Sequence, residues 1–429
     1  MSQEKQTSTV DLYSQYVAPT YGRFKICPKR GEGVFLWDEN GTRYLDFSGG
    51  VAVNSLGHSH PDLLKAISDQ ATDLIHCSNL YQHRGQAELA RLLTEKVVRI
   101  NGKCFFCNSG AEANEGLIKL ARKFGEISPS STGEPRHEIV SFYGSFHGRT
   151  TGGMAATGQE KIRSGFGPLM EGFKYLPFND VDELLNGVGD NTVAILMEPV
   201  QGEGGINVAS EEFLSAVQEL CQTRNILLFF DEVQCGMGRC GDLCGWRMIS
   251  NDQEIKPDAI SWAKGLGGGF PIGAIWIADK GVNDLKLCDL LSPGTHGSTF
   301  GGSPLASSVA STVVRKIIGE KICDNVIKIS ELVINQLQSH PISLITELRG
   351  LSLMLGFQVD VKAINGIDGF QKTNKTPALF LVELLAESGL LTVPAGPDVI
   401  RWLPPLNVKE EQIMEALDIM RTVFEKINT

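Results

Sequence analysis

The sequence predicts an α/β protein whose main sheet is covered by helices on both faces, followed by a smaller α+β unit. Three observations predict this class. From about residue 85, helical and strand patterns alternate along the chain. The strand segments are almost continuously apolar, as expected for strands buried on both faces. The last ninety or so residues mix strands and helices in a separate unit, which begins near residue 335.

The expected elements follow one another without an internal repeat. In chain order they are a helix over 85–98, a strand over 103–107, a helix over 112–124, strands over 138–143 and 192–198, a helix over 210–221, strands over 226–232 and 259–263, and long helices over 304–320 and 410–427. Residues 126–138, rich in serine and proline, are expected to form a surface loop.

Composition narrows the classes of partner. The 429 residues are 42% hydrophobic and 21% charged, which is typical of a folded soluble protein. The net charge of −11 and the absence of a Lys/Arg-rich run argue against a nucleic-acid surface, so we expect small-molecule partners. No apolar stretch is long enough for a membrane helix, and the polar first sixteen residues predict neither a signal nor a transit peptide.

Ten cysteines are too few and too irregularly placed for a disulfide scaffold, so we expect a reducing, cytoplasmic setting. Cys104 and Cys107 form a C-x-x-C pattern, but they lie in an apolar run that predicts a buried strand, whereas redox pairs sit at a helix start. Cys235, Cys240 and Cys244 lack the repeated spacing of structural zinc sites, so no metal is predicted.

Ligands of open α/β sheets bind beyond the carboxyl ends of the strands, and small residues follow the 103–107 strand there. Ser109, Gly110 and Ala111 stand immediately before a predicted helix. Exposed backbone N–H groups at such a helix start favour a phosphate. An ordinary helix cap explains Ser109 equally well at this point.

Two carboxylates and a lysine end neighbouring strands. Glu198 ends the strand over 192–198, and Asp231 follows five apolar residues. A carboxylate in that position needs a partner, either a ligand or a structural donor. Lys264 follows the strand over 259–263 and precedes a cluster of glycines. It is either a charge that reaches solvent or a primary amine for Schiff-base chemistry.

The combination of these features indicates one cofactor. A phosphate cradle, an acidic partner for a pyridinium nitrogen and a reactive amine are what pyridoxal 5'-phosphate requires. The sequence therefore predicts pyridoxal phosphate as the cofactor, held where the strands end.

Eight ordered motifs carry a resemblance to a known family. They are "YLDFSGGVAVNSLGHSHP", "NSGAEANE", "FHGRT", "EPVQGEGG", "DEVQCGMGR", "AKGLGGGFPIGA" and "HGSTFGGSPLA", with "AGPDVIRWLPPL" near the end. With them the chain resembles class III (fold type I) pyridoxal-phosphate aminotransferases nearly end to end. The resemblance implies a large domain with a mostly parallel seven-stranded sheet between helices, a smaller α+β domain, and a homodimer with shared active sites. It divides the chain into 1–84, contributing to the small domain and dimer interface, 85–335, the large domain, and 336–429, the small domain.

The resemblance also implies the roles of the site residues. Lys264 holds the cofactor covalently and moves the proton once freed, and Asp231 pairs with the pyridine nitrogen. The implied cofactor contacts are Ser109, Gly110 and Ala111 for the phosphate, Phe146, Val233 and Gln234 around the ring, and the partner subunit's Thr299, with Ser298 beside it touching substrate.

Two arginines answer the need to accept two different substrates in one pocket. By resemblance, Arg149 binds the carboxylate remote from the reacting centre, and Arg401 binds the α-carboxylate of glutamate. Glu203 resembles a switch that pairs with Arg401 when the amine substrate lacks that carboxylate. A simple surface ion pair between Glu203 and Arg401 is the alternative.

The resemblance implies an amine donor reacting with 2-oxoglutarate, and "DEVQCGMGR" and "AGPDVIR" favour N-acetylornithine as that donor. Succinylornithine, ornithine and 4-aminobutyrate are the neighbouring choices. A glutamate-1-semialdehyde-type aminomutase or an inactive cofactor-binding protein are further alternatives, which the presence of Glu203, Arg401 and Lys264 argues against. The segment 247–255 is longer than is usual in this branch and is expected to lie on the surface.

Overall fold

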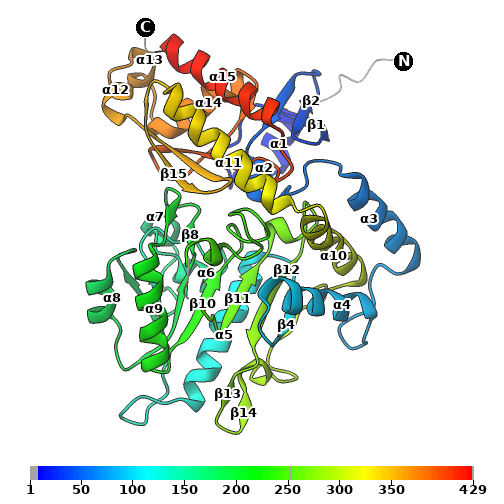
Figure 1. The fold of residues 1–429 in the computed structure, drawn as a ribbon, viewed down its shortest axis with the longest axis vertical. Coiled ribbons are helices and arrows are strands. Elements are labelled where there is room, and N and C mark those ends of the chain that lie inside the picture. The colour runs from blue at the N-terminus through cyan, green and yellow to red at the C-terminus, as the bar shows by residue number, and fades with distance from the viewer. Residues whose placement is uncertain (1–7, 251–253, 428–429) are drawn as a thin grey trace.

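The computed structural model describes residues 8–250 and 254–427 and shows two units stacked one above the other (Figure 1). The lower unit contains the main sheet with its helices. The upper unit contains the first strands and the last helices that the structure describes, coloured blue and orange to red. The α/β class predicted from the sequence is confirmed.

The main sheet has seven strands in the order β4-β12-β11-β10-β7-β5-β6. Their bounds are Gly102–Cys107 for β4, Gly273–Ala278 for β12, Ala259–Trp262 for β11, Leu227–Asp231 for β10, Thr192–Met197 for β7, Glu138–Phe142 for β5 and Phe173–Leu176 for β6. The five strands from β11 to β6 pair in parallel, whereas β12 runs antiparallel to both of its neighbours. The sheet is therefore mostly parallel, as expected.

Helices cover both faces of this sheet because side chains alternate along each strand. In β10, Leu227 and Phe229 pack in the cluster that contains α5, whereas Leu228 and Phe230 pack in the cluster that contains α9. The principal helices of this unit are α4 (Arg84–Leu92), α5 (Gly110–Ile127), α6 (Thr151–Ala156), α8 (Val181–Gly187), α9 (Glu211–Thr223) and α10 (Pro304–Gly319), with α3 (Pro61–Asp73) packed on α10.

The upper unit contains two four-stranded sheets. One joins β1 (Pro28–Glu32), β2 (Phe35–Asp38) and β3 (Arg43–Asp46) to β17 (Leu390–Leu391), and the other has the order β15-β16-β19-β18. The bounds in the second sheet are Ile345–Leu351, Met354–Val359, Val399–Trp402 and Val393–Pro394, respectively. The first sheet thus pairs strands from the two ends of the chain.

The long helices that accompany these sheets are α11 (Ile322–Ser339), α14 (Pro377–Glu387) and α15 (Glu410–Ile427). Helix α11 contains the expected domain boundary at residue 335, and it packs against α10 of one unit and α15 of the other. The divisions 1–84, 85–335 and 336–429 therefore stay a prediction.

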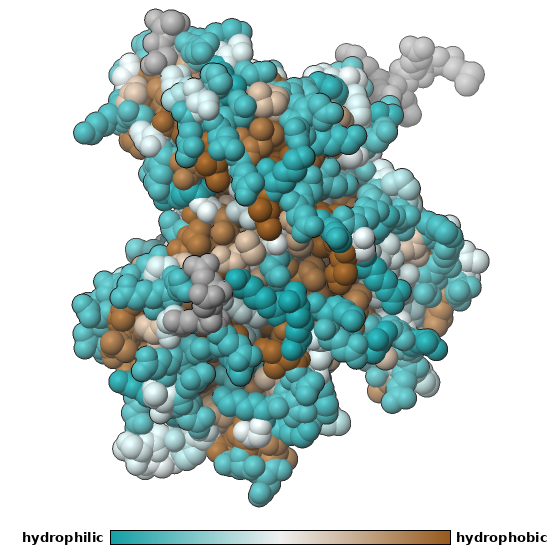
Figure 2. Space-filling view, in the orientation of Figure 1, coloured by the Kyte–Doolittle hydropathy of each residue, from teal (hydrophilic) through white to brown (hydrophobic). Residues whose placement is uncertain are grey.

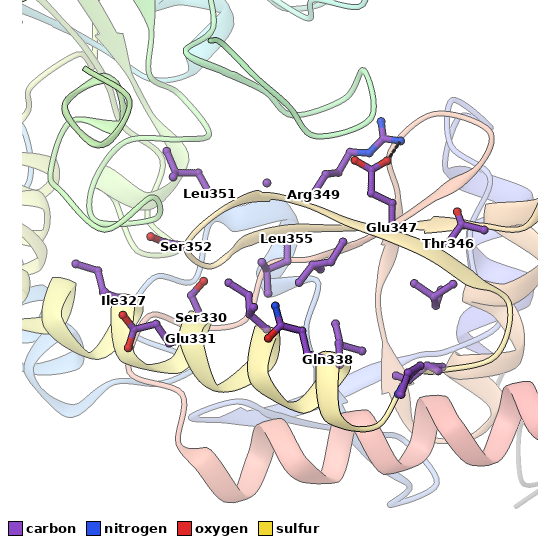
Figure 3. Close-up of a pocket in the computed structure, with 17 residues that line it drawn as sticks. Ile327, Ser330, Glu331, Gln338, Thr346, Glu347, Arg349, Leu351, Ser352 and Leu355 are labelled. Atoms are coloured by element: carbon purple, nitrogen blue, oxygen red, sulfur yellow. Dashed lines mark hydrogen bonds and ion pairs between the residues drawn. The ribbon is translucent and has the colours of Figure 1, made fainter. Parts of the chain in front are cut away.

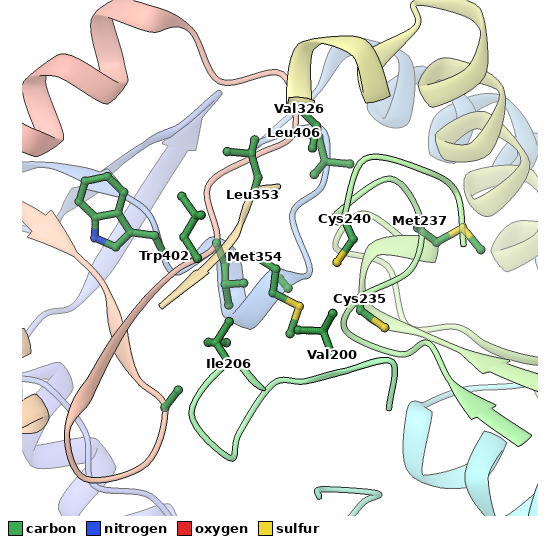
Figure 4. Packing of buried hydrophobic residues seen from close by; sticks show 14 of the residues in the cluster. Val200, Ile206, Cys235, Met237, Cys240, Val326, Leu353, Met354, Trp402 and Leu406 are labelled. Atoms are coloured by element: carbon green, nitrogen blue, oxygen red, sulfur yellow. The ribbon is translucent and has the colours of Figure 1, made fainter. Parts of the chain in front are cut away.

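A continuous apolar core joins the two units. Figure 4 shows Val200, Cys235 and Cys240 of the lower unit facing Met354 and Leu406 of the upper one, all buried. In Figure 2 the surface narrows between the units, and apolar side chains gather in this hollow. Because dispersion and hydrophobic terms hold this junction, the two units have a defined relative position.

The structure agrees with the prediction for the C-x-x-C cysteines but differs from the prediction for the segment 247–255. Cys104 and Cys107 lie in β4 as free thiols, in agreement with a buried strand. In the segment 247–255 the residues 251–253 lie outside the described part of the chain, but Ile249 and Ile255 are buried. The expectation of a surface segment was therefore wrong for its flanks, because their apolar side chains join the core cluster. No helix among the described residues is long and apolar enough to cross a membrane.

Candidate active site

A cavity of about 210 Å³ opens where the parallel strands end. The twelve residues that line it come from five of the predicted motifs. They are Gly110, Ala111, Asn114, Phe146, His147, Gly148, Arg149, Glu198, Asp231, Val233, Gln234 and Lys264. Eight of the cofactor and substrate contacts predicted from the sequence therefore meet in one place.

Lys264 begins a short 3₁₀ turn, Lys264–Leu266, immediately after β11. Its φ of 40° lies in the left-handed region, which a lysine adopts only when its surroundings demand it. Burial lowers the pKa of its amine, and the nearby Glu203 carboxylate opposes that effect in part. A lowered pKa leaves more of the amine neutral and therefore nucleophilic.

Asp231 is 3% exposed at the end of β10, and three donors bind its carboxylate. Oδ2 accepts from Asn114 Nδ2 at 2.7 Å and from His147 Nδ1 at 2.8 Å. Oδ1 accepts from the backbone N–H of Val233 at 3.0 Å. These bonds satisfy a buried charge and hold the carboxylate in a single orientation.

Asn114 and His147 are the functional residues that the sequence interpretation missed. Asn114 Oδ1 also accepts from Ser261 Oγ at 2.7 Å, and the Nε2 atom of His147 is buried without a partner. Asn114 lies four residues after Gly110, so it faces the cavity one helical turn later. That spacing was the available signal, whereas nothing local pairs His147 with an aspartate 84 residues away.

The start of α5 forms the predicted anion cradle. The side chain of Ser109 caps the helix by accepting from the N–H of Glu112, so Ser109 supports the cradle without lining the cavity. The N–H groups of Gly110 and Ala111 have no acceptor within the helix. A Cβ added at Gly110 would lie 2.8 Å from Val233 Cγ1, and one added at Gly148 would lie 3.0 Å from Ala111 Cβ. Only glycines permit this close approach.

Phe146 and Arg149 stand at the mouth of the cavity. The Arg149 guanidinium lies 5.6 Å from the centre of the Phe146 ring and is exposed, so it is available to an anionic ligand. The N–H of Phe146 donates to Glu198 Oε2 at 3.0 Å. Burial raises the pKa of Glu198 to about 7, and Asp231 adds to that shift.

Arg401, on β19, pairs with Glu203 beside the cavity. Arg401 is 2% exposed, and its Nη1 donates to Glu203 Oε1 at 2.7 Å, to Gln234 Oε1 at 2.7 Å and to Gly202 O at 2.9 Å. Among residues 8–250 and 254–427, Nη2 has only a 3.4 Å contact with Pro394 O, and Nε has no partner. The guanidinium therefore keeps donors for a second anion.

The pairing controls the ionisation of Glu203. Burial alone would raise the pKa of this carboxyl, but the Arg401 guanidinium outweighs burial and lowers it to about 2. Gln234 joins the pair to the cavity, because it lines the cavity and contacts both side chains. A surface ion pair is excluded as an interpretation by the burial of Arg401.

Ser298 and Thr299 lie outside this cavity. They line a separate depression together with residues 78–84 and 104–106. Ser298 Oγ accepts from Asn108 Nδ2 at 3.2 Å, so the depression lies behind the turn that carries the anion cradle. Neither residue is among those that line the cavity with Lys264.

Comparisons with known proteins show the family of the chain. The family model for aminotransferase class III matches residues 16–424. An acetylornithine aminotransferase of Caldanaerobacter subterraneus is 44% identical, over 96% of this chain and 98% of its own length. The solved N-acetylornithine aminotransferase of Stenotrophomonas maltophilia is 33% identical, with a TM-score of 0.77 over 97% of this chain and 98% of that one.

A solved ornithine aminotransferase of Toxoplasma gondii, reported with partial occupancy of PLP at its active site, has a higher TM-score of 0.86. It is 30% identical, over 99% of this chain and 96% of that chain.

The pKa of Glu203 gives a prediction about acid stability. A carboxyl whose pKa falls from 4.5 to about 2 on folding stabilises the fold above pH 4.5, and this stabilisation is lost as the pH falls towards 2. We expect Glu203→Gln to lose on the order of 3 kcal/mol at pH 7, and the difference from the parent protein to shrink below pH 4.5. Urea unfolding at pH 7, 5, 4 and 3 measures it. A difference independent of pH would contradict the assignment.

Proposed function

The chain belongs to the aminotransferase class III family, and from this premise we propose that it transfers the δ-amino group of N2-acetyl-L-ornithine to 2-oxoglutarate. The products are N-acetyl-L-glutamate 5-semialdehyde and L-glutamate, and the step belongs to arginine biosynthesis. One observation carries the proposal: the cavity that holds Lys264 and Asp231 adjoins an arginine that is already neutralised by Glu203.

The residues present fit pyridoxal 5'-phosphate. The unpaired N–H groups of Gly110 and Ala111 suit the phosphate, the buried Asp231 suits a protonated ring nitrogen, and Lys264 supplies a primary amine. Phe146 and Val233 offer apolar surface to the two faces of a ring. When bound, the cofactor supplies an aldehyde that condenses with amines and a ring that accepts electrons.

Lys264 acts as the nucleophile and then as the proton carrier. Because burial lowers its pKa, the amine spends more time neutral at the pH of a cell and can attack a carbonyl carbon. The amine of Lys264 would hold the cofactor and, when free, would take the proton from the reacting carbon and return it elsewhere. Lys264 lines the cavity, so its amine is available to a ligand there.

Asp231 holds a proton on the ring nitrogen by electrostatic attraction. Its three donors fix the carboxylate, and His147 lies on the side away from solvent. A preorganised charge of this kind stabilises the transition state without reorganising. Asn114 and His147 are therefore positioning residues for Asp231.

Arg149 and Arg401 let one pocket accept two substrates. Arg149 binds the carboxylate remote from the reacting carbon, which acetylornithine and glutamate both carry. Arg401 binds the α-carboxylate of glutamate, and Glu203 takes its place when acetylornithine is bound. Without Glu203 a buried guanidinium would face an apolar stretch of the donor, which is unfavourable.

We further propose a cytoplasmic homodimer with shared sites. The position of Ser298 and Thr299 supports this, because they line a different depression from the cavity that holds Lys264 in their own chain. In a dimer the partner subunit's Thr299 would complete the phosphate contacts, and the partner subunit's Ser298 would touch substrate. Membrane and nucleic-acid partners have no support in the charge or the apolar pattern.

The choice of amine donor tests the function directly. We expect N-acetylornithine to convert the cofactor faster than succinylornithine, ornithine or 4-aminobutyrate, and we expect glutamate to convert it as well. Mixing purified protein with each donor and following the visible band of the covalently bound cofactor measures every half-reaction separately. A faster conversion by ornithine or 4-aminobutyrate would keep the cofactor and Lys264 but overturn the donor. Conversion by none of the donors would overturn transamination.

Replacing the lysine tests the chemistry. Lys264→Ala removes both the nucleophile and the proton carrier, so we expect transamination to fall by at least about 10²-fold, with the fold retained. Lys280→Ala, which removes an exposed lysine paired with Asp258, is the matched control. Near-normal turnover of the Lys264 variant would contradict the mechanism.

Replacing the arginine tests the two-substrate account. Arg401→Ala removes the site for the α-carboxylate, so we expect kcat/KM for glutamate to fall by at least about 10-fold more than kcat/KM for N-acetylornithine. Stopped-flow measurement of the two half-reactions gives both values. Equal losses for the two substrates would show that Arg401 serves only the fold.

A further inference from the structure

The loop that carries Glu203 contacts the upper unit in two places, at the Glu203–Arg401 ion pair and at Ile206. The loop spans residues 202–206 between β8 (Val200–Gln201) and β9 (Asn207–Val208), which pair antiparallel. Glu203 stands near its start, flanked by glycines. Ile206, at its end, is fully buried.

Ile206 faces a row of residues in the upper sheet. Arg349 of β15 pairs with Gly356 of β16, and Gly356 pairs in turn with Arg401 of β19. Residues directly opposite in antiparallel strands project from the same face of the sheet. The two arginines therefore flank a glycine that leaves a gap between them.

The Ile206 side chain fills this gap. A Cβ added at Gly356 would lie 2.9 Å from Ile206 Cβ, and one added at Gly350 would lie 3.0 Å from Ile206 Cγ2. Figure 4 shows Ile206 directed from its loop towards the strands that carry Met354 and Trp402. The two glycines thus form a slot that accepts this side chain.

The backbone at Ile206 is strained. Its φ is 57°, in the left-handed region, where a β-branched residue is a true outlier. Such a conformation persists only where the surroundings over-determine it. Glycine would suit the backbone better, so the slot is what favours a branched side chain here.

Arginines hold the loop on both sides of Ile206. Arg401 Nη1 donates to Gly202 O at 2.9 Å, and Arg349 Nη1 donates to Asn207 Oδ1 at 3.3 Å and approaches Gly205 O at 3.5 Å. Figure 3 shows Arg349 leaving the β15–β16 hairpin on the side away from α11. The loop is therefore fastened at its two ends and, through Ile206, between the arginines.

We propose that Ile206 is a positioning residue that sets the balance between the two substrates. Seated in the glycine slot, it keeps the loop backbone in place so that Glu203 reaches Arg401 when the amine donor is bound. When an α-carboxylate binds to Arg401, only the Glu203 side chain then has to move, and the loop backbone stays in place. The inference rests on one part of the proposed function. It needs one substrate that carries a carboxylate on the reacting carbon and one substrate that does not.

Two variants test the contact from opposite sides. Ile206→Gly empties the slot and relieves the backbone, whereas Gly356→Ala fills the slot and displaces Ile206. For both we expect kcat/KM for N-acetylornithine to fall by about 10-fold relative to kcat/KM for glutamate, because a misplaced Glu203 leaves Arg401 unpaired beside the amine donor. Ile206→Val keeps a β-branched side chain in the slot, so we expect it to keep the parent protein's ratio of the two kcat/KM values.

A fully buried leucine provides the matched control. Leu385→Ala truncates a side chain in α14 of the upper unit, which also contains the glycine slot. This position is far from the loop in sequence, so the change should alter both half-reactions by the same factor. The double variant Ile206→Gly/Glu203→Gln should show the same ratio of the two kcat/KM values as Glu203→Gln alone. Both changes act on the pairing of Glu203 with Arg401, so their effects should not add.

Hydrogen exchange of the 200–208 peptide gives a readout independent of activity. We expect exchange to rise at least about 10-fold in Ile206→Gly and to stay unchanged in Leu385→Ala. Unchanged exchange in Ile206→Gly overturns the anchor, and faster exchange with an unchanged substrate ratio overturns its link to Glu203. If N-acetylornithine is not the donor, the comparison of donors with the parent protein already shows it. The ratio is then measured with whichever donor lacking an α-carboxylate converts the parent.

Discussion

The buried carboxylate of Asp231 is the interaction on which the rest of the site depends. A charge that is 3% exposed is tolerated only when donors surround it, and Asn114, His147 and the N–H of Val233 supply them. These donors come from α5, from the loop after β5 and from the loop after β10. Satisfying one charge therefore ties together the elements that also carry the anion cradle and the cavity wall.

The second requirement is the burial of Arg401 at the junction of the two units. Its strand belongs to the upper sheet, whereas its partners Glu203, Gln234 and Gly202 belong to the lower unit. A buried guanidinium without these acceptors would cost several kcal/mol. The apolar core between the units and the polar pair at its edge therefore support each other. Substrate choice in our proposal depends on both of them.

Much of this was predictable from local sequence. The strand over 226–232 and the helix over 112–124 follow from apolar periodicity, and Ser109 is recognisable as a helix cap. Parallel strands end at one edge of a sheet, so the strand pattern alone predicts that Glu198, Asp231 and Lys264 lie together. The reversed strand β12 was not predicted, because six apolar residues read the same way in either direction.

By itself the sequence determined the α/β class and the residues at the strand ends and predicted the cofactor, because these depend on periodicity and on neighbours close in the chain. Only the tertiary structure decided which distant groups meet. His147 lies 84 residues from Asp231, and Arg401 lies 198 residues from Glu203. Ile206 finds its slot at Gly350 and Gly356 across the two units. Such contacts arise from packing between elements, and no local pattern encodes which side chain will fill a given gap.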